Sequence, residues 1–94
     1  MGVIRSFGDK HTEALYAGQR VRRFEAIRNQ AIKRLDRIEA ATSLEDLSAV
    51  PGNRLEALSG DRKGQHGIRI NDQWRICFRW SGDGAEDVEI VDYH

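Results

Sequence analysis

The strictest constraint on how this chain folds is a side-chain alternation in its last third. Large apolar residues alternate with Arg75, Cys77 and Arg79, and they are Trp74, Ile76, Phe78 and Trp80. Successive side chains of a β-strand point to opposite faces. The segment is therefore predicted to be a strand whose aromatic face lies in the core and whose other face presents two guanidinium groups.

A second strand is predicted just before this one. Ile68 and Ile70 alternate with Gly67 and Arg69, and Asn71-Asp72 then supplies residues that tolerate turn and left-handed backbone geometry. The two arms are predicted to pair as a β-hairpin. This hairpin would hold several cations on a rigid frame.

One long helix is predicted from about Gln19 to Ala41. Its apolar residues recur at steps of three and four, and they are Val21, Phe24, Ile27, Ala31, Leu35 and Ile38. This spacing makes one apolar stripe that covers the sheet. The basic side chains around the rest of the helix are either solvated, or they dock on RNA or an acidic partner; they are Arg22, Arg23, Lys33, Arg34 and Arg37.

Shorter elements complete the fold. Asp9 is a candidate N-cap, and Thr42 with Glu45 has the spacing of a capping box in which Thr42 is the cap. The other expected elements are an edge strand over 2–7, helices over 9–16 and 43–49, and strands over 54–58 and 87–94. This order predicts one α+β domain over 1–94, with helices on one face of an antiparallel sheet.

The totals limit the class of protein. The chain has 94 residues and one cysteine, Cys77, so an internal disulfide and a cysteine-based zinc site are excluded, and a reducing compartment is expected. Its three histidines lack metal-ligand spacing, so no metal is expected. No apolar run is long enough to span a membrane and the first residues lack an apolar signal-peptide core, so the simplest expected location is the cytoplasm.

The charge is laid out in blocks although the formal net charge is zero. Residues 19–37 carry seven cations against Glu25 and Asp36, and residues 62–80 carry five against Asp72. A local positive patch can bind phosphate whatever the net charge is, although many charged faces are only solvated. Five cations from adjacent segments are predicted to form one phosphate-binding surface, and they are Arg62, Lys63, Arg69, Arg75 and Arg79.

The terminal pair Tyr93-His94 offers groups for proton transfer, because an imidazole titrates near neutral pH and a phenol can donate a hydrogen bond. The alternative is an ordinary strand end. Cys77 could be activated by the arginines beside it, but a small semi-buried thiol is the simpler interpretation. No phosphate-binding glycine loop and no nucleophile elbow is present, so nucleotide hydrolysis and triad chemistry gain no support.

Three stretches together resemble the HigB branch of the RelE-like bacterial toxins: Gly60-Asp61-Arg62-Lys63-Gly64, the hairpin from Ile68 to Phe78, and the ending Val88 to His94. The resemblance covers essentially the whole chain. It implies a RelE-like fold, in which a small antiparallel sheet packs against N-terminal helices. It also implies the toxin of a type II toxin-antitoxin system, a ribosome-dependent endoribonuclease that enters the ribosomal A site and cuts mRNA without a metal or other cofactor.

The resemblance also implies partners and residue roles. A HigA-like helix-turn-helix antitoxin would neutralise the toxin, and operator DNA would be contacted only through that complex. Arg75 would stabilise the phosphate, His94 would transfer a proton, and Tyr93 would orient the substrate or share that role. The cations expected to bind RNA are Arg62, Lys63, Arg69 and Arg79.

Three positions depart from the pattern of the family. Ser59 stands where relatives commonly carry lysine, Glu56 where some carry histidine, and Gly67 where serine or a larger residue is usual. Loss of the lysine would remove transition-state stabilisation and lower turnover. Two alternatives follow: a weakened toxin that acts mainly as an antitoxin-binding co-repressor, and an RNA-binding domain without chemistry, whose affinity would fall with salt and would not depend on His94.

Overall fold

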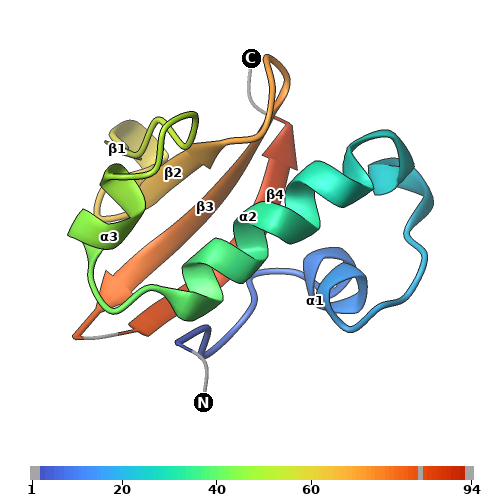
Figure 1. Ribbon diagram of the computed structural model, residues 1–94, viewed down its shortest axis with the longest axis horizontal. Coiled ribbons are helices and arrows are strands. Elements are labelled where there is room, and N and C mark those ends of the chain that lie inside the picture. Colours follow the sequence, from blue (N-terminus) through green and yellow to red (C-terminus); the bar gives the residue numbers. More distant parts are fainter. Residues whose placement is uncertain (1–2, 83, 93–94) are drawn as a thin grey trace.

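The computed structural model describes residues 3–82 and 84–92, in which helices cover one face of a four-stranded sheet (Figure 1). The helical elements are α1 (Lys10–Tyr16), the 3-10 helix η1 (Arg22–Ile27), α2 (Arg28–Ala40), α3 (Leu44–Ser48) and the 3-10 turn η2 (Gly60–Arg62). The strands are β1 (Glu56–Ala57), β2 (His66–Arg69), β3 (Trp74–Ser81) and β4 (Gly84–Asp92). They lie in the order β1-β2-β3-β4 with antiparallel neighbours, which confirms the predicted α+β class.

The predicted hairpin is confirmed. Ile68 lies opposite Ile76 in the β2–β3 ladder, and the Asn71 side-chain oxygen closes the turn by accepting hydrogen bonds from the backbone N–H groups of Gln73 and Trp74, each at 2.8 Å. Ile76 and Phe78 are fully buried. The Trp74 ring meets Phe24 edge to face with a centroid distance of 5.5 Å. The tryptophans therefore pack against the helical layer, as their shared side of the strand indicates.

The long helix is segmented, so the prediction of one helix over 19–41 needs correction. The apolar stripe is buried as expected, but its first part is the 3-10 helix η1 and only its second part is the α-helix α2. The spacing explains the change. Val21, Phe24 and Ile27 follow steps of three, which match the three residues per turn of a 3-10 helix. From Ile27 the steps lengthen toward the α-helical period, through Ala31 and Leu35.

The predicted capping box is wrong by one residue. Ser43, not Thr42, caps α3, and its hydroxyl accepts a hydrogen bond from the Asp46 N–H at 3.2 Å. The Asp46 carboxylate, not that of Glu45, reaches back and accepts from the Thr42 N–H at 2.9 Å and from the Thr42 hydroxyl at 2.6 Å. These hydrogen bonds lower the pKa of Asp46. Leu47 of α3 lies in the core, where it is 1% exposed.

The other predicted elements are found with changed bounds, and the strand expected over 87–94 is β4, which begins earlier, at Gly84, and is described as far as Asp92. The Asp9 carboxylate caps α1 by accepting from the Thr12 N–H at 3.1 Å, and the strand expected over 54–58 is the two-residue β1. The N-terminal strand is reduced to isolated bridges in which Ile4 and Phe7 pair with β4 in a parallel sense. Figure 1 shows this segment running beside β4, at the sheet edge opposite β1.

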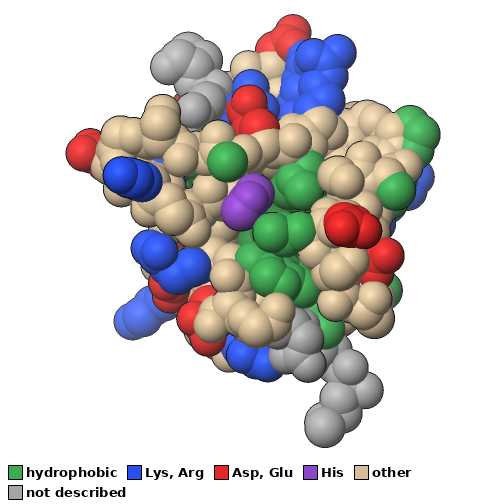
Figure 2. Space-filling view, turned by 90° about the vertical axis from the view of Figure 1, so that its left-hand side faces the viewer, with side chains coloured by type: hydrophobic (Ala, Val, Ile, Leu, Met, Phe, Trp, Pro, Cys, Tyr) green, Lys and Arg blue, Asp and Glu red, His purple; other side chains and the backbone are tan. Residues whose placement is uncertain are grey.

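Most apolar side chains lie in one core between the helices and the sheet, but some remain exposed. Figure 2 shows a row of hydrophobic side chains with a histidine at one end, on the side of the molecule where α3 and β1 lie. Within the described ranges, no helix is long and apolar enough to cross a membrane.

A buried hydroxyl ties α1 to the sheet. Thr12 is 0% exposed, and its Oγ1 accepts a hydrogen bond from the Ile90 N–H of β4 at 2.9 Å. This bond supplies the partner that a buried backbone N–H needs.

We predict that Thr12→Val lowers the free energy of unfolding by about 1–3 kcal/mol, because valine keeps the shape of threonine but leaves the Ile90 N–H without an acceptor. Thr12→Ser is the matched control, since it keeps the acceptor and loses about one methylene equivalent, ~0.8 kcal/mol. Urea denaturation of the three proteins measures the effect. Equal stabilities of the valine variant and the parent would contradict the assignment.

Candidate functional site

The face of the sheet turned away from α2 carries a cluster of charged side chains, here called the open face. Strand register places the members together: Arg69 lies opposite Arg75, and Gly67, Cys77 and Glu89 lie side by side on three strands. Glu56 joins them because it pairs with Gly67 at the β1 edge. The open face is therefore formed by Glu56, Gly67, Arg69, Arg75, Cys77, Arg79 and Glu89.

Arg75 lies inside this cluster. Its Nη1 forms an ion pair with Glu56 Oε1 at 3.3 Å, and its side chain is 22% exposed against 51% for Glu56. The guanidinium is thus held by packing, whereas the carboxylate is half in water. An anionic ligand could therefore displace Glu56 from Arg75, because solvent can readily hydrate the released carboxylate.

Arg62 reaches the open face from η2. Gly60 enters the turn with a φ of 64°, a conformation that glycine adopts without strain. The Arg62 Nη1 atom donates to Gln65 Oε1 at 3.0 Å and to Glu89 Oε1 at 2.8 Å. Arg62 and Glu89 are almost equally covered, with 31% and 25% of their side chains exposed. This pair therefore fastens the 60–64 loop to β4.

Arg79 also lies against that loop. A Cβ atom at Gly64 would come within 2.9 Å of Arg79 Nη1, so the missing side chain of Gly64 leaves room for the guanidinium. Arg79 Nε lies 3.9 Å from Asp87 Oδ2. Asp87 has a φ of 55° at the point where the β3–β4 register shifts, so a bulge in β4 places its carboxylate beside Arg79.

Arg69 is directed to the hairpin loop. Its Nε donates to the Asn71 carbonyl at 3.2 Å, and its Nη2 forms an ion pair with Asp72. Lys63 follows Arg62 and is exposed. The structure therefore brings Arg62, Arg75 and Arg79 together on the open face, with Arg69 at one end and Lys63 on the loop.

Cys77 occupies the centre of the cluster and is fully buried. Burial raises the pKa of its thiol above the ordinary value; the charges of Arg62 and Arg75 oppose that shift, and those of Glu89 and Glu56 add to it. A buried thiol with a raised pKa is a poor nucleophile. The structure thus supports the simpler interpretation of Cys77 as a packing residue, and its surroundings show that Arg62 and Arg75 both lie close to it.

Packing against Leu58 explains why glycine stands at position 67. A Cβ atom at this position would lie 3.3 Å from Leu58 Cδ2, so Leu58 occupies the space that a side chain on Gly67 would fill. Leu58 is only 8% exposed as a result. The departure at position 67 therefore goes with the close contact of Leu58 against β2.

Tyr93 and His94, predicted as catalytic, lie outside the described residues. Within the described chain, β4 ends at Asp92 opposite Trp74, and Val91 lies opposite Arg75. No group of three or more possible metal ligands occurs in the described ranges.

The sequence analysis missed the carboxylates of the open face and its margins. Glu56, Glu89, Asp72 and Asp87 each lie beside one of the predicted cations. The partner of Glu89 is Arg62 of the η2 turn, and this pair became identifiable only from the structure.

Comparison with known proteins identifies the family. Residues 5–94 match the family of HigB-like toxins, described as the RelE-like toxin of the type II toxin-antitoxin system HigB. Toxin HigB-1 of Vibrio cholerae serotype O1 is 38% identical over 90 residues, which are 94% of each chain.

Two solved structures share the fold. YoeB in the YoeB-YefM complex from Staphylococcus aureus has a TM-score of 0.56 at 14% identity over 97% of each chain. The YoeB dimer from the same organism gives the same TM-score and identity over 98% of each chain. The sequence match and the shared fold agree: the chain belongs to the HigB-like family of RelE-like toxins from type II toxin-antitoxin systems.

Proposed function

We propose that this toxin is a ribosome-dependent endoribonuclease that cuts mRNA in the A site and thereby stops translation. Toxins of this family are ribonucleases. The observation that carries the proposal is the open face, where the guanidinium groups of Arg62, Arg75 and Arg79 gather beside the strand that leads to Tyr93 and His94.

The proposed reaction is an intramolecular transesterification of an RNA phosphodiester. The ribose 2′-oxygen attacks the adjacent phosphorus, and the bond from phosphorus to the 5′-oxygen breaks, which leaves a 2′,3′-cyclic phosphate and a 5′-hydroxyl. A base removes the 2′-hydroxyl proton and an acid protonates the leaving 5′-oxygen. His94 transfers one of these protons, and Tyr93 orients the substrate or shares that role.

Arg75 supplies the charge stabilisation in this proposal. The pentavalent phosphorane gains negative charge, and a fixed guanidinium can bind two of its oxygens. The partial burial of Arg75 supports this role, because a held cation needs little reorganisation during the reaction. Glu56 moves toward solvent as the phosphate arrives. Arg62, Lys63, Arg69 and Arg79 bind the flanking RNA.

The same proposal names the partners. The chain is the toxin of a toxin-antitoxin pair, and one structural neighbour is the YoeB-YefM complex. A HigA-like helix-turn-helix antitoxin neutralises this toxin, and operator DNA is reached only through their complex. The exposed hydrophobic row of Figure 2 supports a protein partner, since such rows mark interaction surfaces. The site of action is the ribosome, in the cytoplasm.

A specific observation favours a second candidate, a weakened toxin that serves mainly as an antitoxin-binding co-repressor. Ser59, at the start of η2, stands where the family commonly has lysine, so one cation of the expected site is missing. Four cations of the open face and its margins also have acidic neighbours in the described chain. Both features lower the positive potential that an RNA phosphate meets.

We predict that His94→Ala reduces ribosome-dependent cleavage by about 10²–10⁴-fold, the range for loss of a general acid or base. Primer extension on mRNA from translating ribosomes maps the cuts. His11→Ala is the matched control, because His11 is an exposed histidine of α1. Naked mRNA tests the need for the ribosome. Cuts that persist in His94→Ala would refute the assignment of His94.

We predict that Ser59→Lys raises the cleavage rate by about tenfold or more if the missing cation acts directly on the transition state. The same primer-extension experiment measures this change. Activity that appears only in Ser59→Lys would show that the natural chain is the weakened toxin. An unchanged rate would show that Ser59 is not the limiting feature.

We predict that Glu56→Gln strengthens RNA binding and cleavage by about two- to fivefold, the value of releasing a partly exposed ion pair. Glu45→Gln on α3 is the control, since it changes the net charge equally at an exposed position outside the open face. Cleavage rates measured over a range of ribosome concentrations give the changes in binding and in cleavage. A fall in activity for Glu56→Gln would mean that Glu56 holds Arg75 in its working position.

A further inference from the structure

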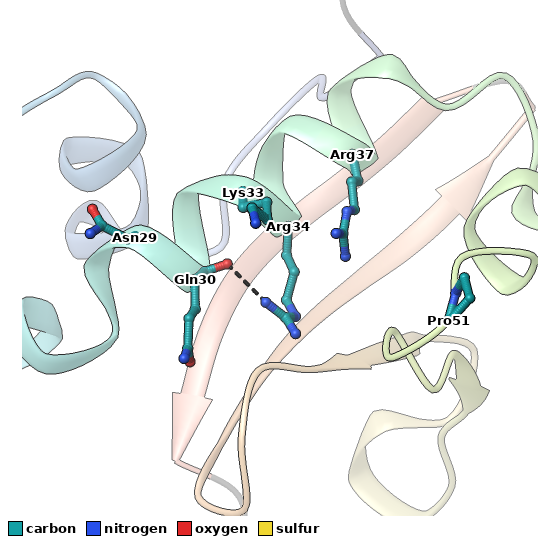
Figure 3. Close-up of a pocket in the computed structure, with 6 residues that line it drawn as sticks. All are labelled: Asn29, Gln30, Lys33, Arg34, Arg37 and Pro51. Atoms are coloured by element: carbon teal, nitrogen blue, oxygen red, sulfur yellow. Dashed lines mark hydrogen bonds between the residues drawn. The ribbon is translucent and has the colours of Figure 1, made fainter.

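A second concentration of positive charge lies outside the open face, in a hollow beside α2. Its volume is about 320 Å³, and its lining residues are Asn29, Gln30, Lys33, Arg34, Arg37 and Pro51. Figure 3 shows side chains of α2 directed to the side of the helix on which Pro51 lies. No acidic side chain lines the hollow among the residues that the structure describes.

The two arginines are held in place by neutral acceptors. Arg34 Nε donates to the Arg69 carbonyl at 2.8 Å and its Nη1 to the Gln30 carbonyl at 3.3 Å. Arg37 Nη1 donates to the Asn53 side-chain oxygen at 3.1 Å. A guanidinium has five N–H donors, so these bonds fix the groups and leave donors for a ligand. The pair contrasts with the open face, where carboxylates lie beside the cations.

The acidic residues of α2 are used on other sides of the helix. Asp36 accepts a hydrogen bond from the Tyr16 hydroxyl at 2.9 Å, and Glu39 accepts from the Ile4 N–H at 2.8 Å. Burial and the neighbouring charge of Arg37 lower the pKa of Arg34. The two guanidiniums therefore repel each other within the hollow, and a bound anion would relieve that repulsion.

The chemistry of the lining indicates the ligand. Arginine, lysine, asparagine and glutamine are the side chains that contact nucleic-acid phosphates and sugars. An acidic peptide would be expected to bring an apolar anchor into an apolar pocket, but Pro51 is the one apolar side chain among the described residues that line this hollow. The lining thus favours a phosphate backbone over a peptide.

We infer that this hollow is a second RNA-binding site, which holds the phosphate backbone of structured ribosomal RNA while mRNA occupies the open face. The inference rests on the proposed function, because it supplies the contact by which the toxin would stay on the ribosome. The two sites are joined through β2: Arg34 binds the carbonyl of Arg69, whose own side chain lies on the open face. An RNA bound to Arg34 in the hollow would therefore be linked to β2 through the Arg69 carbonyl, while the Arg69 side chain remains on the open face.

Lys33 allows a clean test, because it is exposed and no hydrogen bond of the described core depends on it. Binding is measured with ribosomes whose A-site codon carries 2′-deoxyribose, which removes the attacking hydroxyl and leaves the protein unaltered. Loss of one phosphate contact in Lys33→Ala should reduce the slope of log K against log salt by about 1, and affinity at 0.1 M salt by about tenfold. Lys33→Glu should weaken binding further.

Lys10→Ala is the control, since it removes one exposed lysine from α1 and should leave the salt slope unchanged. Thermal melting of each variant checks its fold. The cleavage rate should also be unchanged in Lys10→Ala, because Lys10 lies outside the hollow and the open face.

The outcomes separate the two proposals. Suppose that the parent cleaves mRNA and that the parent and both Lys33 variants have equal salt slopes. This result would overturn the assignment of the hollow as an RNA-binding site and leave the proposed function intact. Absence of cleavage by the parent and by Ser59→Lys would overturn the proposed function, while a slope change at Lys33 would still support an RNA site. Loss of antitoxin capture by Lys33→Glu, with ribosome binding unchanged, would overturn the RNA assignment in favour of an acidic peptide.

Discussion

The structure depends on the packing of β3 against the helical layer. Ile76 and Phe78 are buried with Leu35 and Ile38 in one core, and the same strand pairs with β2 on one side and β4 on the other. Because side chains alternate along a strand, burying the even-numbered residues of β3 forces Arg75, Cys77 and Arg79 to the opposite face. The core and the open face are thus two consequences of one register.

The open face keeps its cations in place before any RNA arrives. The Arg75 side chain is less exposed than that of Glu56, and the Arg69 side chain is less exposed than that of Asp72. In both pairs the carboxylate is therefore the partner that water can more readily solvate. Exposed ion pairs are worth about 0–1 kcal/mol, which is little for a phosphate to displace. Arg62 and Glu89 differ, because both are largely covered, and that pair is better suited to hold the 60–64 loop than to exchange its partner.

The fold was readable from the sequence where a pattern decided the outcome locally. The alternation from Trp74 to Trp80 and the turn at Asn71-Asp72 gave the hairpin without further information. The helix over 19–41 was found but not its 3-10 start, although steps of three from Val21 to Ile27 carry that signal. The cap was misplaced because Thr42 and Ser43 are both good caps. The hydrogen bonds of Ser43 and Asp46 in the structure distinguish them.

Only the cations of the site could be predicted from the sequence, for a related reason. Arg62, Arg75 and Arg79 were expected to gather. Arg75 and Arg79 lie on one face of β3, and the η2 turn brings Arg62 to that face through its bond to Glu89. Their carboxylate neighbours are Glu56 of β1, Glu89 of β4 and Asp87 at a bulge in β4, and a bulge cannot be placed before the register is known. The positively charged side of α2 had two open interpretations, solvated or docking. The hollow distinguishes it from a merely solvated face, because the Arg69 carbonyl and Asn53 hold Arg34 and Arg37 in place.

The same contacts connect stability to function. Asn53 is fully buried; its side chain donates to the Leu47 carbonyl at 3.0 Å and accepts from Arg37, while its own carbonyl accepts from the Arg69 N–H at 2.8 Å. One residue therefore joins α3 and α2 through its side chain and β2 through its backbone. Because Arg37 lines the hollow and Arg69 belongs to the open face, a change at Asn53 would disturb both charged surfaces at once. Changes at exposed Lys33 or Glu56 can alter one surface and leave the other in place.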